Sequence, residues 1–202
     1  MTSNDQLAAV EVLCEFFEIA IHNILYARKL YPDAVFESRK KYGVVVYQAV
    51  HPGIQNYIQN CLKAVAFHCK KRQLQRLYVC FESDEIVRER FVFDVLGVTE
   101  LYDSDPFFVE LEQYFRSFIL KLHSSQIYLP DLPTDSSFSI RLQTSFNLSV
   151  EFNENPSFEE FPWVEESKSD IISEDRLSII PVYTVDTQCL KIQILIETPQ
   201  LP

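Results

Sequence analysis

The residues from Phe138 to Phe152 alternate between apolar and polar side chains along most of this stretch. The apolar series is interrupted at Thr144, and its members are Phe138, Ile140, Leu142, Phe146, Leu148, Val150 and Phe152. The residues between them, from Ser139 to Glu151, are all polar. Because successive side chains of a strand point to opposite faces, this pattern predicts a strand with one buried and one solvated face. Such a strand is typical of an antiparallel sheet that helices cover on one side.

Three segments predict helices that would supply this cover. Residues 7–30 have apolar side chains at helical spacing on two faces, which predicts a helix buried on both sides at the centre of the domain. A second helix begins at His51-Pro52 and ends at 70–72, and a third begins at Asp105-Pro106. Strands are predicted at 44–47, 77–81 and 86–95, the last two joined by a short hairpin loop at 83–85. Helices and strands do not alternate strictly, which favours an α+β domain over a doubly wound one.

The charge balance and the cysteines indicate a soluble protein of the cytosol or nucleus. Lys and Arg number 18 against 29 Asp and Glu, a net charge of −11. A phosphate backbone would repel such a chain, so we expect no direct binding of nucleic acid. The five cysteines are an odd number with mostly apolar neighbours, as is usual for buried thiols in a reducing compartment. The sequence has neither a signal peptide nor an apolar run long enough to span a membrane.

Local motifs of nucleophilic or metal-dependent enzymes are missing from the sequence. Its three glycines are spaced too widely for a phosphate-binding loop: Gly43, Gly53 and Gly97. Cys61, His68 and Cys69 lie on one predicted helix, but no fourth ligand follows at the spacing of a zinc site. We therefore expect no catalytic activity, no metal and no cofactor.

The C-terminal part of the chain combines an aromatic residue, an acidic stretch and two β-rich runs. Trp163 follows Phe161-Pro162 within the acidic residues 153–176, and the runs at 179–185 and 189–197 predict a terminal hairpin. An apolar chain end on a long polar tether suits a segment that moves and wraps a partner, and an edge strand can accept a strand from a peptide. Trp163, and Tyr57 on the second helix, are then either interface anchors or ordinary core residues.

Taken in order, a set of short motifs resembles the HORMA domain family over nearly the whole chain. These motifs are Val12–Phe16, Ile24–Tyr26, Leu30–Pro32, Arg39–Tyr42, His51-Pro52, Asn56–Gln59, Phe91–Phe93, Arg116, Phe118–Lys121, Phe161–Trp163, Ile180-Pro181 and Leu190–Gln193. Each motif is weak alone, whereas their order and spacing are specific. His51-Pro52, Phe161–Trp163 and Ile180-Pro181 favour the branch that serves DNA polymerase zeta as an accessory subunit over the spindle-checkpoint branch.

The resemblance implies an α+β HORMA fold: an antiparallel sheet with three helices packed on one side and a C-terminal safety-belt hairpin. Residues 1–202 would form a single HORMA domain, with a core at about 1–152 and a belt at about 153–202. In this family the belt moves between an open and a closed packing and, when closed, wraps a partner peptide that pairs as a strand.

The resemblance further implies a non-catalytic adaptor of translesion DNA synthesis, located in the nucleus and also in the cytoplasm. Tyr57 and Trp163 would line the groove for a peptide of the catalytic subunit of polymerase zeta. Ile179, Gln193 and Leu195 would form an outer surface for the C-terminal domain of a Y-family scaffold polymerase. The alternative function is a spindle-checkpoint-type regulator of the anaphase-promoting complex.

Arg116 matches a family position for self-association, as a homodimer or a HORMA heterodimer, and is otherwise a solvated helix-surface arginine. A AAA+ remodeller is a further partner that the resemblance implies. Two residues depart from the family pattern: Glu165 stands where relatives have an apolar groove residue, and Leu195 replaces a tyrosine. We therefore expect the partner peptide to differ in sequence from those of the relatives.

Overall fold

The computed structural model describes residues 3–98, 105–145, 161–166, 177–187 and 190–199. Its helices are α1 (Ser3–Ala27), α2 (Pro52–Lys70) and α3 (Asp105–Ser125), with short 3-10 helices η1 (Asp33–Val35) and η2 (Gln126–Tyr128). Its strands are β1 (Phe36–Lys41), β2 (Val44–Ala49), β3 (Leu74–Ser83), β4 (Ile86–Val98), β5 (Ser137–Thr144), β6 (Leu177–Asp186) and β7 (Leu190–Pro199).

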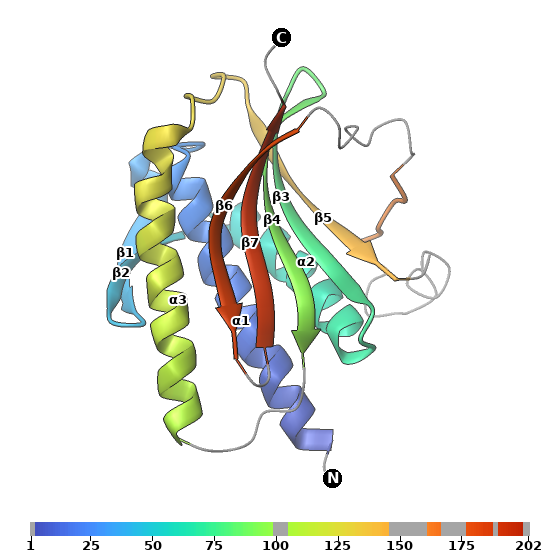
Figure 1. Ribbon diagram of the computed structural model, residues 1–202. Coiled ribbons are helices and arrows are strands. Elements are labelled where there is room, and N and C mark those ends of the chain that lie inside the picture. Colours follow the sequence, from blue (N-terminus) through green and yellow to red (C-terminus); the bar gives the residue numbers. More distant parts are fainter. Residues whose placement is uncertain (1–2, 99–104, 146–160, 167–176, 188–189, 200–202) are drawn as a thin grey trace.

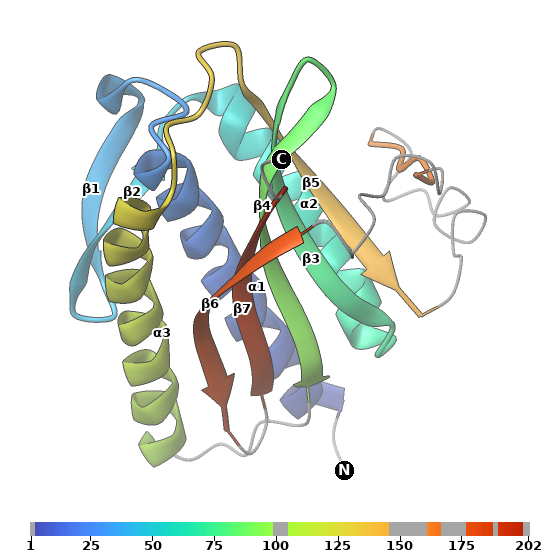
Figure 2. The same ribbon diagram turned by 45° about the horizontal axis from the view of Figure 1, so that its top comes forward.

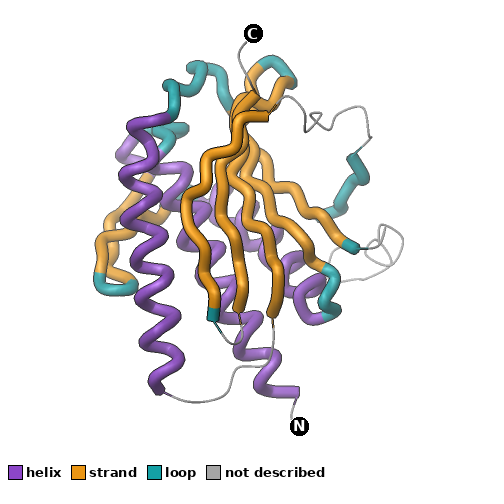
Figure 3. Tube along the Cα trace, viewed as in Figure 1, coloured by secondary structure: helices purple, strands orange, loops and turns teal. Residues whose placement is uncertain are grey.

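The strands form two antiparallel sheets (Figure 1). β1 pairs with β2, and the larger sheet has the strand order β5-β3-β4-β7-β6. The three helices lie on one face of the larger sheet, with α3 beside β6 and α2 behind β3 and β5 (Figures 1 and 3). This arrangement confirms the prediction of an α+β fold with an antiparallel sheet, helices on one side and a C-terminal hairpin.

α1 lies at the centre of the core, as its two apolar faces predict. The side chains of Phe16 and Phe17 are fully buried. Phe16 stacks on Phe115 of α3, with ring centroids 4.1 Å apart, and Phe17 meets Phe93 of β4 edge to face at 5.3 Å. The helix is therefore held between α3 and the sheet, and its buried side chains contribute to the apolar core.

Two polar side chains of α1 accept hydrogen bonds from backbone N–H groups of β2, as a neighbouring strand would. The Tyr47 N–H donates to Asn23 Oδ1 at 3.1 Å, and the Ala49 N–H donates to His22 Nδ1 at 3.3 Å. Burial lowers the pKa of His22 to about 4, so the ring stays neutral and can accept this hydrogen bond. The β1–β2 hairpin is thereby fixed against α1.

The terminal hairpin β6–β7 belongs to the core. Val185, Ile192, Ile194 and Ile196 have no exposed surface, and β7 pairs with β4 over most of its length. The predicted runs at 179–185 and 189–197 are confirmed as strands, although Cys189 lies outside the described residues.

Several element boundaries differ from the sequence predictions. α1 ends at Ala27 instead of residue 30, because the chain turns at Lys29, where φ is 51°. β1 was not predicted, since its central residues are polar and exposed and show no alternation. β5 ends at Thr144, and the remainder of the predicted strand, up to Phe152, lies outside the described residues apart from Ser145.

The hairpin between β3 and β4 is tighter than predicted. Ser83 still belongs to β3, and only Asp84 and Glu85 form the loop, with φ of 53° and 61°. Positive φ at both loop residues is the geometry of a type I′ turn, one of the two turns favoured in two-residue hairpins. In the described part of the chain, no helix combines the length and apolar character needed to cross a membrane.

Candidate functional site

β5 forms one edge of the larger sheet, because β3 is its only strand partner among the described residues. Its other side faces residues 161–166, which we call the strap (Figure 2). In the middle of β5, the Ile140 N–H points away from β3 and donates to the Tyr57 hydroxyl of α2 at 2.9 Å. A sheet edge that lacks a second strand partner can accept a strand from another polypeptide.

A row of five aromatic rings runs along this edge. Tyr31, in the loop after α1, meets Phe138 of β5 edge to face at 6.3 Å, and Phe138 meets Tyr57 at 5.3 Å. Tyr57 then contacts Phe161 of the strap at 5.8 Å, and Phe161 contacts Trp163 at 6.1 Å. Tyr57 and Trp163 are the two residues that the sequence predicts for a groove. The ring of Phe161 lies between them and connects them.

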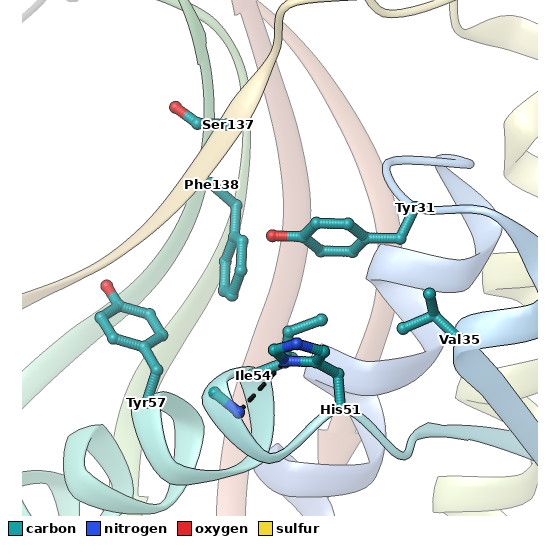
Figure 4. Close-up of a pocket in the computed structure, with 8 residues that line it drawn as sticks. Tyr31, Val35, His51, Ile54, Tyr57, Ser137 and Phe138 are labelled. Carbon is teal, nitrogen blue, oxygen red and sulfur yellow. Dashed lines mark hydrogen bonds between the residues drawn. The ribbon is translucent and has the colours of Figure 1, made fainter.

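The row begins at an apolar cavity of about 460 Å³. Its lining residues come from the loop after α1, from the start of α2 and from β5, and are Tyr31, Val35, His51, Gly53, Ile54, Tyr57, Ser137 and Phe138 (Figure 4). His51 caps α2, because its Nδ1 accepts the Gly53 N–H at 3.1 Å. Pro52 follows at the first helical position, so this wall is held by a capped helix end. Aromatic grooves of this type bind extended, proline-containing segments.

The strap crosses the free edge of β5. Trp163 packs against Ala64 of α2, on the helix side of the sheet. Glu166, three residues later, forms an ion pair with Arg141. Arg141 lies between Ile140 and Leu142, whose side chains face the helices, so its own side chain is on the opposite face. The strap therefore passes from the helix side to the outer face and encloses the edge of the strand.

Comparison with known proteins identifies the fold. The sequence matches the model of the HORMA domain over residues 9–100. It is 32% identical over 189 residues to the Homo sapiens protein named mitotic spindle assembly checkpoint protein MAD2B, covering 93% of this chain and 89% of that protein. The chain belongs to the HORMA domain family.

Other relatives of this HORMA protein have names from DNA replication. DNA polymerase zeta subunit 2 of Drosophila melanogaster is 26% identical over 189 residues, covering 92% of this chain and 96% of that protein. Among solved structures, a chain of the mitotic checkpoint complex matches with a TM-score of 0.79 at 21% identity, covering 95% of this chain and 98% of that chain. C. elegans HTP-2 bound to a HIM-3 closure motif matches with a TM-score of 0.69 at 12% identity, covering 95% and 90%. The resemblance to the HORMA family and the predicted HORMA fold are both confirmed.

The three residues predicted for an outer surface of this HORMA protein lie together on its terminal hairpin. Gln193 and Leu195 alternate with buried isoleucines of β7, so both point away from the helices. Ile179 of β6 pairs with Glu197 of β7 and shares this face, where 57% of its surface is exposed. Their role stays a prediction, but the structure places them on one surface, separate from the aromatic row.

Arg116 is exposed on α3, on a different element from the aromatic row and from the three residues of the outer surface. Its guanidinium lies against Gly43 in the β1–β2 turn, where φ is 72° and an added Cβ would come within 3.2 Å of Arg116 Nη1. A second cavity, of about 320 Å³, opens beside the same helix. It is lined by Tyr26, Val44, Val45, Tyr47, Leu120 and His123.

Burial keeps three ionisable side chains of this HORMA protein protonated. Burial raises the pKa of Cys61 and Cys80 to about 12, which keeps both thiols protonated and poorly nucleophilic at neutral pH. Burial also raises the pKa of Tyr57 above its usual range, so its hydroxyl stays neutral beside Ile140. Within the described ranges, no three His, Cys, Asp or Glu side chains are grouped to hold a metal ion.

Sequence reasoning missed several residues of the groove. Tyr31 and His51 appear in the family motifs but were not assigned to the site, and Phe138 was assigned only to the apolar face of a strand. The pairing of Arg141 with Glu166 was also missed, because nothing in the sequence relates two charges 25 positions apart.

Proposed function

We propose that this HORMA protein is a non-catalytic adaptor that captures a partner peptide as an added strand along β5, beneath the strap. The observation that carries this proposal is the edge of β5 that has no second strand partner among the described residues, lined by a row of aromatic rings and enclosed by residues 161–166. The backbone of β5 would supply hydrogen bonds for affinity, and the rings and the cavity would supply side-chain specificity.

The crossing strap gives this capture a kinetic consequence. A peptide that lies between β5 and the strap cannot leave sideways until the strap opens. Release then requires local opening of the segment that carries Trp163, so dissociation is slow even where the direct contacts are few. Slow release suits an adaptor that holds a subunit through many encounters.

We further propose that the partner is a peptide of the catalytic subunit of DNA polymerase zeta, and that the adaptor links it to a Y-family scaffold polymerase in the nucleus. The Drosophila relative named DNA polymerase zeta subunit 2 aligns over almost the whole chain and supports this choice. Glu165 is exposed on the strap, two residues after Trp163.

The test is capture of synthetic peptides by the purified full chain. We expect a proline-containing peptide of the polymerase zeta catalytic subunit to bind at one-to-one stoichiometry by calorimetry. Hydrogen exchange of the β5 amides should slow on binding, because the added strand pairs with the free edge. Binding without added protection in β5 would contradict strand addition.

A spindle-checkpoint function is the second candidate. It is supported by the printed name of the human relative and by the match to a chain of the mitotic checkpoint complex. The same calorimetric assay with peptides of anaphase-promoting-complex activators separates the two functions. Tighter binding of those peptides than of the polymerase peptide would favour the checkpoint role.

For the outer surface, we expect Gln193→Ala to weaken binding to the C-terminal domain of the scaffold polymerase by about tenfold or more. Gln193 is exposed on β7 and carries no core contact, so peptide capture should be unchanged. Pull-down with each partner measures both activities. Ser178→Ala, at another exposed position of the hairpin, is the control, and parallel loss of both partners would contradict separate surfaces.

For self-association, we expect Arg116→Ala to shift a dimer toward monomer, raising the dimer dissociation constant by about tenfold. The reason is that Arg116 is an exposed cation on α3, the helix whose Leu120 and His123 line the second cavity, and this face would receive a second HORMA domain. Sedimentation of the full chain over a concentration series measures the shift. Gln113 is exposed on the same helix, and Gln113→Ala should leave the sedimentation profile unchanged. An unchanged profile for Arg116→Ala would show that Arg116 is a solvated surface residue with no role in self-association.

A further inference from the structure

The strap is attached to the rest of the protein in two different ways. On the helix side, Phe161 and Trp163 make apolar contacts with Tyr57 and Ala64. On the outer face, Glu166 makes an ion pair with Arg141. The first attachment is the aromatic row already described, whereas the second plays no part in the groove itself.

Neighbouring side chains orient Arg141 so that it can bind the carboxylate of Glu166. One guanidinium nitrogen, Nη1, contacts Glu166, while Nη2 contacts Glu82 Oε1 of the neighbouring strand β3 at 2.5 Å. Ser139, on the same face of β5, donates to the same Glu82 oxygen at 2.7 Å and accepts from Arg141 Nε at 3.4 Å. The guanidinium is thus oriented by the sheet, independently of the strap.

This arrangement separates a fixed part from a moving part. Glu82, Ser139 and Arg141 all belong to paired strands, so their backbone is held by the sheet and not by Glu166. Opening of the strap breaks the ion pair between Arg141 and Glu166. The ion pair between Arg141 and Glu82 remains and keeps the guanidinium oriented for reclosure. The three charged side chains are 22% to 35% exposed, so solvent screens the pair only in part.

The pair is also distinct from the other ion pairs of the outer face. Arg76–Asp94 joins β3 to β4, and Arg90–Glu197 joins β4 to β7. Both stay within the sheet. Among the described residues, Arg141–Glu166 is the ion pair that connects the strap to the sheet.

We propose that Arg141 and Glu166 form an electrostatic latch that holds the strap closed over β5 and sets how long a captured peptide is retained. The retention part rests on the proposed function, whereas closure of the strap itself does not. The latch acts on the release rate, because the carboxylate lies on the strap and its partner Arg141 lies on the outer face of β5.

Closure of the strap is measured in the absence of peptide by the fluorescence of Trp163, the single tryptophan of the chain. We expect Glu166→Gln to raise the acrylamide quenching constant of its fluorescence about twofold, because the strap opens more often. In the Arg141→Gln background, Glu166→Gln should add nothing. Glu110→Gln removes an equal charge from an exposed position on α3 and should leave quenching unchanged. Equal quenching of wild type and Glu166→Gln would overturn the latch.

Retention is measured by stopped-flow release of a labelled polymerase zeta peptide from the preloaded full chain. We expect Glu166→Gln to speed release about three- to tenfold, with little change in the association rate. Raising NaCl from about 50 to about 500 mM should speed release from wild type and not from Glu166→Gln, since salt screens only an existing pair. Salt-independent release from wild type would overturn retention by the latch. A chain that binds no peptide but shows the quenching change would refute the proposed function and leave the latch intact.

Discussion

Replacing Arg28 by methionine lowers the free energy of unfolding by about 3–5 kcal/mol, the expected result of leaving a buried charge without its partner. Arg28 Nε lies 2.8 Å from Glu89 Oε1, and the two side chains are only 5% and 2% exposed. Arg28 Nη2 also donates to the Pro130 carbonyl at 2.6 Å. The substitution removes both contacts, so it loosens the end of α1, the middle of β4 and the segment that leads into β5. Urea denaturation of wild type and variant measures the loss.

The pH dependence of this loss has a definite sign. Burial raises the pKa of Glu89, and Arg28 opposes that rise. Without Arg28 the folded-state pKa rises further above the unfolded value, so the folded state holds a proton that the unfolded state releases. Stability of the variant is then best preserved at low pH and falls as pH rises from the unfolded pKa to the raised folded pKa. Arg28→Met with Glu89→Leu should recover most of the stability, and a single variant that loses less than about 1 kcal/mol would show that the pair is not a stabilising feature.

Replacing Trp163 by alanine lowers affinity for the captured peptide by about 2–4 kcal/mol, as expected for a large aromatic anchor. Trp163 ends the aromatic row and is half-buried against Ala64, at the margin of the main core. Its removal opens one end of the groove and detaches the strap on the helix side. Calorimetric titration of the peptide measures the loss, and we expect the unfolding transition to keep its cooperativity.

The adjacent Val164 provides a matched control for this substitution. Its side chain is 89% exposed, so Val164→Ala should bind peptide with wild-type affinity. Wild-type affinity of Trp163→Ala would reject the anchor role. A collapse of stability in Trp163→Ala, with no specific effect on binding, would instead identify Trp163 as a core residue.

The fold was predictable wherever local pattern and tertiary burial agree. The alternation at Phe138–Leu142 and the two apolar faces of α1 each require a buried surface, and the structure supplies it. The strand β1 was not predictable, because its residues are held by pairing with β2 and not by burial of their own side chains. A polar strand of this kind has no periodic signal in the sequence.

The site was predictable only in part, for a related reason. Tyr57 and Trp163 came from a family pattern, and the structure brings them into one row through Phe161. The cavity depends on Tyr31 and Phe138, which are more than 100 positions apart and meet only after the sheet has formed. Contacts of such long range depend on the topology of the sheet, which no local motif encodes.

The terminal hairpin limits the routes by which a guest can be exchanged. Val185, Ile192, Ile194 and Ile196 would all meet water if β6–β7 peeled away from β4. At about 1.5–3 kcal/mol for each aliphatic side chain, the total is on the order of the whole stability of an ordinary domain. Thermal fluctuations alone would take that route about as rarely as global denaturation, so prompt turnover of a loaded complex by this path would require an external input of free energy.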